Sequence, residues 1–160
     1  MNSSNLYSPK YISKVANQNI HGSGQVDMII VTYPDFLGQA NELADYHRQH
    51  DNLRVLVATN DQVYNEFSSG GQDLCAIRDM ARLFYKRAGS DTTQMPRYLL
   101  LFGGASYDPK NRLAKNSNFV PVFESSESSN SISGFSTDDF YGFLDDNENI
   151  GDVNLVNTLD

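Results

Sequence analysis

Residues 26–32 read VDMIIVT, an apolar run that does not alternate with polar residues and that decides the class of fold. Such a run is typical of a strand buried on both faces, which is the usual position of a strand in a parallel sheet. Two further runs follow at 53–58 (LRVLVA) and 97–102 (RYLLLF). We therefore expect a small, mainly parallel sheet of three or four strands.

Helical patterns alternate with these strands. Apolar residues recur at helical spacing over 34–50, and again over 74–88, where Gly89 is expected to end the helix. Between them, Thr59 and Gln62 have the spacing of a capping box, which predicts the start of a short helix. This order predicts an α/β three-layer sandwich with right-handed crossovers.

The remaining segments are less regular. We expect residues 1–25 to form an irregular arm outside the core, and residues 124–139, rich in Ser, Glu and Asp, to be mobile or loosely packed. Residues 119–123 are extended, but Pro121 keeps them at an edge or outside the sheet. Residues 140–144 (FYGFL) are expected to form one more short strand.

Charge divides the chain into two parts. Residues 116–160 contain nine of the 20 acidic residues and none of the 12 Lys and Arg, which all lie in residues 1–115. A nucleic-acid partner is excluded because phosphate neutralisation needs clustered Lys and Arg. No apolar run approaches the ~18 residues of a membrane span. Residues 1–5 lack the features of a signal peptide, so we expect a cytosolic protein or a segment of a longer chain.

No catalytic residue is predicted from the residues themselves. Cys75 lies beside the apolar face of the third predicted helix, and the nearby Asp73 would raise its pKa, so we interpret it as a structural thiol. His21, followed by glycine, resembles a catalytic pair but falls in the irregular arm. His47 and His50 are interpreted as structural residues of the first predicted helix.

Gly103 and Gly104 follow the third predicted strand, at the edge where α/β sheets place their ligands. Neither a GxGxxG nor a Walker pattern surrounds them. A structural tight turn is therefore favoured over a flavodoxin-like phosphate or nucleotide site, which stays as an alternative.

An acidic turn near the end of the chain carries Asp145, Asn147, Asn149 and Asp152. Alternating oxygen ligands of this kind can bind calcium, although Ile150 stands where a calcium loop has glycine and no Glu stands at the twelfth position. The pattern predicts either a weak calcium site or a solvated acidic turn, because Asp and Asn favour turns in any case. No other cofactor is expected.

Five segments together carry a resemblance to a known family. They are residues 17–22 (NQNIHG), 27–32 (DMIIVT), 43–47 (LADYH), 98–104 (YLLLFGG) and 136–145 (STDDFYGFLD). In this order and spacing the chain resembles the gingipain-type cysteine peptidases over most of residues 17–145.

The resemblance implies a caspase-like peptidase domain of two side-by-side subdomains, with the catalytic His and Cys in the second, downstream of 136–145. Residues 26–160 would then be the first, non-catalytic subdomain, cut before the dyad. The parent would be a cysteine endopeptidase at the bacterial cell surface or outer membrane that removes C-terminal secretion signals from type IX secretion cargo. Its partners would be the catalytic subdomain, secreted cargo and other secretion-system components. The alternative is a stand-alone binding or scaffold module with an acidic surface and no catalysis.

Overall fold

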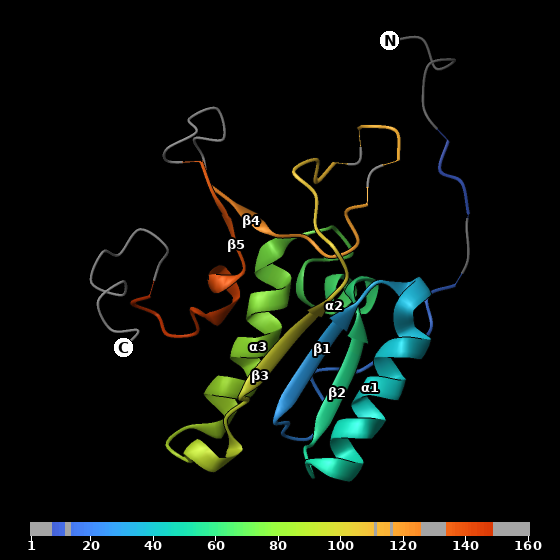
Figure 1. The fold of residues 1–160 in the computed structure, drawn as a ribbon. Helices are drawn as coiled ribbons and strands as arrows, with labels where there is room; N and C mark the ends of the chain where they lie inside the picture. The colour runs from blue at the N-terminus through green and yellow to red at the C-terminus, as the bar shows by residue number, and fades with distance from the viewer. Residues whose placement is uncertain (1–7, 12–13, 111, 116, 126–133, 149–160) are drawn as a thin grey trace.

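The central element is a three-stranded parallel sheet in the order β2-β1-β3. Its strands are β1 (Met28–Thr32), β2 (Val55–Thr59) and β3 (Tyr98–Phe102). The first residue of β1, Met28, pairs with the first residue of each neighbour, Val55 in β2 and Tyr98 in β3 (Figure 1). The computed structural model describes residues 8–11, 14–110, 112–115, 117–125 and 134–148. The predicted parallel sheet is confirmed, with three strands.

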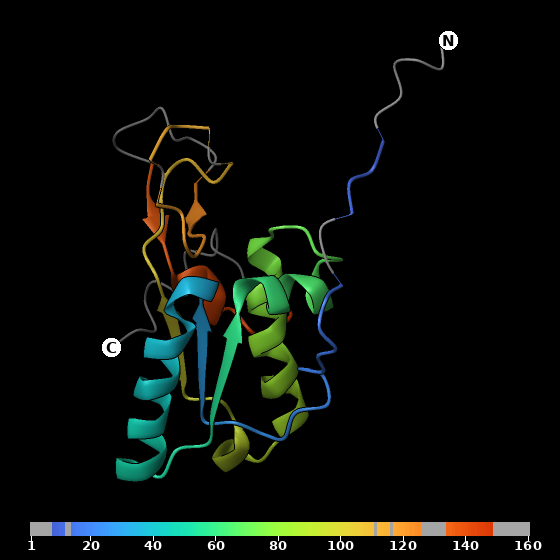
Figure 2. The ribbon, with the colours of Figure 1, turned by 90° about the vertical axis from the view of Figure 1, so that its right-hand side faces the viewer.

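Helices cover both faces of the sheet. The short 3₁₀ helix η2 (Pro34–Phe36) leads into α1 (Leu37–His50), which lies on one face. The other face carries α2 (Asn60–Phe67) and α3 (Leu74–Ala88). Figure 2 shows the three layers edge-on, so the α/β sandwich expected from the sequence is present. Within the described residues, no helix is long and apolar enough to cross a membrane.

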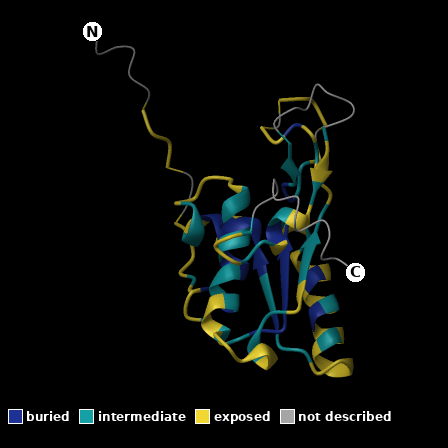
Figure 3. Ribbon diagram, turned by 90° about the vertical axis from the view of Figure 1, so that its left-hand side faces the viewer, coloured by how far each residue is buried: buried dark blue, intermediate teal, exposed yellow. Residues whose placement is uncertain are grey.

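The core is organised around β1, whose five residues are all buried (Figure 3). Ile29 and Val31 pack with residues of α2 and α3, whereas Met28 and Ile30 pack with α1. Successive side chains of a strand point to opposite faces, so an unbroken apolar run supplies both halves of the core.

The helix ends follow local chemistry. The Thr59 hydroxyl accepts a hydrogen bond from the Gln62 amide at 3.3 Å, and the Gln62 side chain accepts one from the Thr59 amide at 2.9 Å. This is the predicted capping box. At the end of α3, Gly89 adopts a φ of 59°, which favours glycine, and occupies the predicted C-cap position.

The strand expected over residues 140–144 is wrong. The 3₁₀ helix η4 (Asp139–Gly142) takes its place. The ring of Tyr141 is 1% exposed, and its hydroxyl donates a hydrogen bond to the Pro121 carbonyl at 2.6 Å. Burial of this one large side chain beside α3 outweighs the weak strand pattern.

The segment around Pro121 lies outside the main sheet, as predicted. It leads into β4 (Phe123–Glu124), which pairs antiparallel with β5 (Ser136–Thr137). Within the stretch 124–139, Glu124 pairs with Ser136, and Thr137 pairs with Phe123 just before the stretch, so these positions are paired rather than loose. Residues 126–133, the rest of the predicted mobile stretch, lie outside the described residues.

The N-terminal arm is irregular as expected, but its placement outside the core is wrong. Residues 14–25 contain no helix or strand. Ile20 is nevertheless 6% exposed and belongs to the cluster on the α2 and α3 side of the sheet. A single apolar residue among polar neighbours shows neither helical nor strand periodicity, so the sequence pattern could not predict that Ile20 is buried.

Replacing the capping threonine tests the predicted start of α2. Thr59→Ala should lower the free energy of unfolding by about 1 kcal/mol, because the Gln62 amide loses its acceptor. Denaturant unfolding followed by circular dichroism measures this change. Thr92→Ala is the control, since Thr92 is exposed and starts a 3₁₀ helix without a capping role. Equal stability of the two variants would contradict the role of the box.

Candidate functional site

Cys75 is the second residue of α3 and is partly buried. Its backbone N–H donates a hydrogen bond to Asp73 Oδ1 at 2.8 Å. Burial raises the pKa of the Cys75 thiol, and the charge of Asp73 raises it further. A nucleophilic cysteine needs the opposite shift, so the geometry supports the interpretation of Cys75 as a structural thiol.

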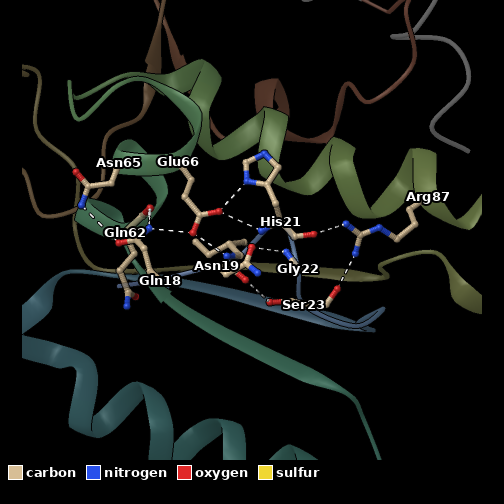
Figure 4. A network of polar contacts seen from close by, with 10 residues as sticks. Gln18, Asn19, His21, Gly22, Ser23, Gln62, Asn65, Glu66 and Arg87 are labelled. Carbon is tan, nitrogen blue, oxygen red and sulfur yellow. Dashed lines mark hydrogen bonds and ion pairs between the residues drawn. The ribbon is translucent and has the colours of Figure 1, made fainter. Parts of the chain in front are cut away.

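His21 is held against α2, which corrects the expectation that it lies in an irregular arm outside the core (Figure 4). Its Nδ1 lies 2.7 Å from Glu66 Oε2, and its ring stacks on Phe67 with centroids 4.4 Å apart. The His21 carbonyl accepts a hydrogen bond from Arg87 Nη2 at 2.8 Å. Both the side chain and the backbone of His21 are therefore anchored.

Glu66 is the centre of this network. Its carboxylate accepts hydrogen bonds from the backbone N–H of Ile20 at 2.7 Å and of His21 at 3.0 Å, and from Gln18 Nε2 at 3.0 Å. Burial alone would raise the pKa of Glu66, but these bonds outweigh burial and lower the pKa to about 2. Glu66 thus clamps the arm to α2. Sequence reasoning missed it because nothing local marks an acid whose partners lie more than 40 residues away.

The His21–Glu66 pair has the composition of a catalytic base and its orienting carboxylate. Within the described residues, however, neither side chain forms a hydrogen bond with a serine, threonine or cysteine side chain. The Glu66 carboxylate instead accepts hydrogen bonds from backbone amides of the arm. The arrangement serves to hold two segments together and brings no nucleophile to the histidine.

The other two histidines lie at the end of α1. His47 Nδ1 is 2.6 Å from Asp51 Oδ2, and His50 Nδ1 is 3.0 Å from the Tyr46 carbonyl. Both contacts are local to the last turn of the helix, as a structural role requires.

A second ionic cluster lies where the sheet begins. Asp27 is 7% exposed and forms a bidentate pair with Arg54, from Nε and Nη2, each at 2.9 Å. The hydrogen bonds from Arg54 lower the pKa of Asp27 to about 2. The Asp27 carbonyl also accepts from the amides of Arg97 and Tyr98. A single carboxylate inside an apolar run was the available sequence signal, and the structure uses it to tie the three strands together.

At the opposite end of the sheet, where the strands finish, Gly103 and Gly104 contact a later segment of the chain around Phe119. A Cβ on Gly103 would lie 3.0 Å from Phe119 Cβ, and the Gly104 carbonyl accepts from the Phe119 amide at 2.9 Å. These contacts support the structural turn. A hollow of about 340 Å³ lies at the same end of the sheet and is lined in part by Tyr33, Asn60 and Tyr64.

The predicted calcium ligands are only partly described. Asp145 lies 3.3 Å from Lys86 Nζ and accepts a hydrogen bond from the Tyr85 hydroxyl at 3.1 Å. The next residue, Asp146, pairs with Arg82. Asn147 is exposed, whereas Asn149 and Asp152 lie outside the described residues. No group of three or more His, Cys, Asp or Glu gathers for a metal in the part of the chain that is described, so the calcium site stays a prediction.

Comparison with known proteins places the fold. The sequence model of peptidase family C25 matches residues 21–155. Among solved structures, dimeric latent PorU from Porphyromonas gingivalis is similar, with 34% identity and a TM-score of 0.76. A search of curated proteins found no match.

This chain belongs to peptidase family C25, the gingipain family. The PorU match covers 91% of this chain but 14% of PorU, so the chain corresponds to a small part of that protein. The caspase-like α/β architecture expected for the N-terminal subdomain agrees with this similarity.

Neutralising the Glu66 clamp should release the arm. Glu66→Gln should lower the free energy of unfolding by about 1–3 kcal/mol, because the amides of the arm that donate to Glu66 lose a charged acceptor. The pKa of Glu66 is lowered in the fold from 4.5 to about 2, so its contribution is complete above about pH 4.5 and is lost as the pH falls toward 2. The variant should therefore lose stability less steeply than the wild type over this range.

Denaturant unfolding between pH 2.5 and 7 measures both effects. Glu42→Gln is the matched control, since Glu42 is exposed on α1. Parallel stability profiles for the wild type and Glu66→Gln would contradict the clamp.

The calcium prediction is tested by thermal melting. A site with a dissociation constant of about 10⁻⁴–10⁻³ M should stabilise the fold by about 1–2 kcal/mol in a few millimolar calcium. Magnesium at matched ionic strength controls for screening, and EDTA gives the metal-free reference. Equal melting temperatures in all three would leave the turn as a solvated acidic loop whose carboxylates pair with α3.

Proposed function

We propose that this chain is a non-catalytic subdomain of a family C25 peptidase and that it supports a catalytic part located elsewhere in the same polypeptide. One observation carries the proposal: within the described residues, the cysteine and the histidines are not assembled into a catalytic pair. The pKa of the Cys75 thiol is raised, and the Cys75 backbone N–H donates a hydrogen bond to Asp73. His21 instead pairs with Glu66 and stacks on Phe67.

The extent of the match to PorU supports this role. A chain that corresponds to 14% of a related protein leaves ample length in such a polypeptide for a catalytic part. What this chain contributes is a rigid three-layer body with a fully buried central strand. Rigid elements of this kind hold neighbouring catalytic groups in position.

The resemblance to gingipain-type peptidases also supports a finer proposal. The complete polypeptide acts at the bacterial cell surface as a cysteine endopeptidase that removes C-terminal secretion signals from type IX cargo. The reaction is acyl transfer, in which a cysteine thiolate attacks the scissile carbonyl and a histidine moves the proton. Both groups are supplied outside the present chain. Its partners are the catalytic subdomain, the secreted cargo and other secretion components.

The purified chain should show no peptidase activity, because the pKa of Cys75, the one cysteine in the sequence, is raised, and no histidine forms a hydrogen bond with it within the described residues. Release of fluorophore from a panel of peptide substrates measures this, with an established cysteine peptidase as the positive control. Cys75→Ser is the matched variant. Turnover by the wild type that Cys75→Ser abolishes would overturn the assignment of a non-catalytic role.

A further inference from the structure

The hollow at the carboxyl end of the sheet is lined by four segments that are far apart in the sequence. They are the turn after β1, the first turns of α2, the turn between α2 and α3, and the loop after β3. The hollow has a volume of about 340 Å³, at the lower end of the range for small-molecule sites. Ligands of α/β sheets commonly bind at this end of the strands.

Hydrogen bonds and ring contacts hold these walls together. Asn60 is 7% exposed and donates from Nδ2 to the Phe119 carbonyl at 2.9 Å. Gln72 donates from Nε2 to the Pro109 carbonyl at 3.1 Å, and the rings of Phe119 and Tyr33 have centroids 5.1 Å apart. The hollow is therefore preformed, and a preformed site loses less entropy when a ligand binds.

Aromatic side chains form much of the wall, namely those of Tyr33, Tyr64 and Phe119. Tyr64 is 5% exposed, and its hydroxyl oxygen is buried with no hydrogen-bond partner in the described part of the chain. Nearly all buried hydroxyls of folded proteins are paired. An unpaired one on a residue that lines a hollow is a candidate partner for a polar group of a ligand.

The charge of the hollow is negative. Asp61 lines it, is exposed, and forms no ion pair within the described residues. Burial raises the pKa of Tyr64, and the charges of Asp61 and Asp73 raise it further, so the field at this phenol is negative. Among the described residues that line the hollow, none is a Lys, Arg or His.

We propose that this hollow binds a small organic cation, an ammonium group carried on a short alkyl chain. The aromatic rings attract the cation, the Asp61 carboxylate compensates its charge, and the Tyr64 hydroxyl accepts a hydrogen bond from one of its N–H groups. This site goes beyond the supporting role proposed above and does not depend on it.

Phosphate or a nucleotide, the alternative that the sequence left open at this end of the sheet, is a poorer occupant. Gly103 and Gly104 are not among the residues that line the hollow. An anion there would be repelled by Asp61, and no basic side chain of the described lining would compensate its charge.

The test uses the full chain, labelled with ¹⁵N, and three probes at neutral pH and matched ionic strength. They are n-butylammonium, its neutral counterpart n-butanol, and inorganic phosphate. Amide chemical shifts report the affinity and the place of binding. n-Butylammonium should shift the amides of Asn60–Tyr64 and Phe119 and should bind about tenfold more tightly than n-butanol, because the alcohol lacks the charge. Phosphate should leave these amides unshifted.

Two variants separate the contributions to binding. Asp61→Asn should weaken n-butylammonium binding about threefold to fivefold, as expected for an exposed ion pair, and should leave n-butanol binding unchanged. Tyr64→Phe should weaken n-butylammonium binding about tenfold, because the ammonium loses an acceptor. In thermal melting without a probe, Tyr64→Phe should melt no lower than the wild type, since the hydroxyl that it removes has no partner.

Glu42→Gln and Tyr46→Phe are the matched controls. Both residues are exposed on α1 and neither lines the hollow, so both variants should bind n-butylammonium as the wild type does.

Four results would overturn the proposal. These are shifts confined to other parts of the chain, equal affinity for n-butylammonium and n-butanol, tighter binding of phosphate, or unchanged n-butylammonium affinity in either site variant. A lower melting temperature of Tyr64→Phe would likewise refute the role of its hydroxyl, by showing that the fold itself uses this group. None of these measurements involves peptidase activity, so failure here would leave the proposed function intact.

Discussion

The complete burial of β1 is the constraint on which the rest of the structure depends. Its side chains alternate between the two faces of the sheet, so burying all five requires cover on both sides. α1 supplies one cover, and α2 with α3 supplies the other. Because its backbone must also be paired, β1 needs a strand at each edge, which β2 and β3 provide. The three-layer architecture follows from these two requirements.

Two carboxylates, the buried Asp27 and the half-buried Glu66, hold the less regular parts of the chain to this body. Asp27 joins the starts of the three strands through Arg54 and through its own carbonyl. Glu66 holds the N-terminal arm to α2 through two backbone amides and a side-chain amide. In both cases charged hydrogen bonds lower the pKa to about 2, so the groups stay ionised at neutral pH. Strongly shifted pKa values often mark active sites, but here they mark structural contacts.

Membership of a peptidase family and the absence of a catalytic pair among the described residues are compatible. Function resides in sites carried by a fold, and a chain that matches 14% of a related protein can contain the support without the site. None of the five residues of the edge strand β3 is buried, which points the same way. An apolar edge strand exposed in a functional protein is a liability unless another segment covers it.

The sequence alone determined the features that depend on local chemistry. The apolar runs predicted the strands of the main sheet, because period and composition suffice to recognise a buried strand. The Thr59–Gln62 capping box and the Gly89 C-cap were predictable because their partners lie within a few residues. The segments that resemble the gingipain family could also be recognised from their order and spacing in the sequence.

Only the tertiary structure decided the features whose partners are distant in sequence. Ile20 enters the core, and His21 is fixed, because Glu66 lies 45 or more residues away and no local pattern joins them. Residues 139–142 form a 3₁₀ helix because Tyr141 reaches Pro121 and buries its ring. Likewise, nothing in YLLLF distinguishes a central strand from an edge strand. Its place in the strand order, set by the crossovers between strands, leaves β3 with one strand neighbour among the described residues.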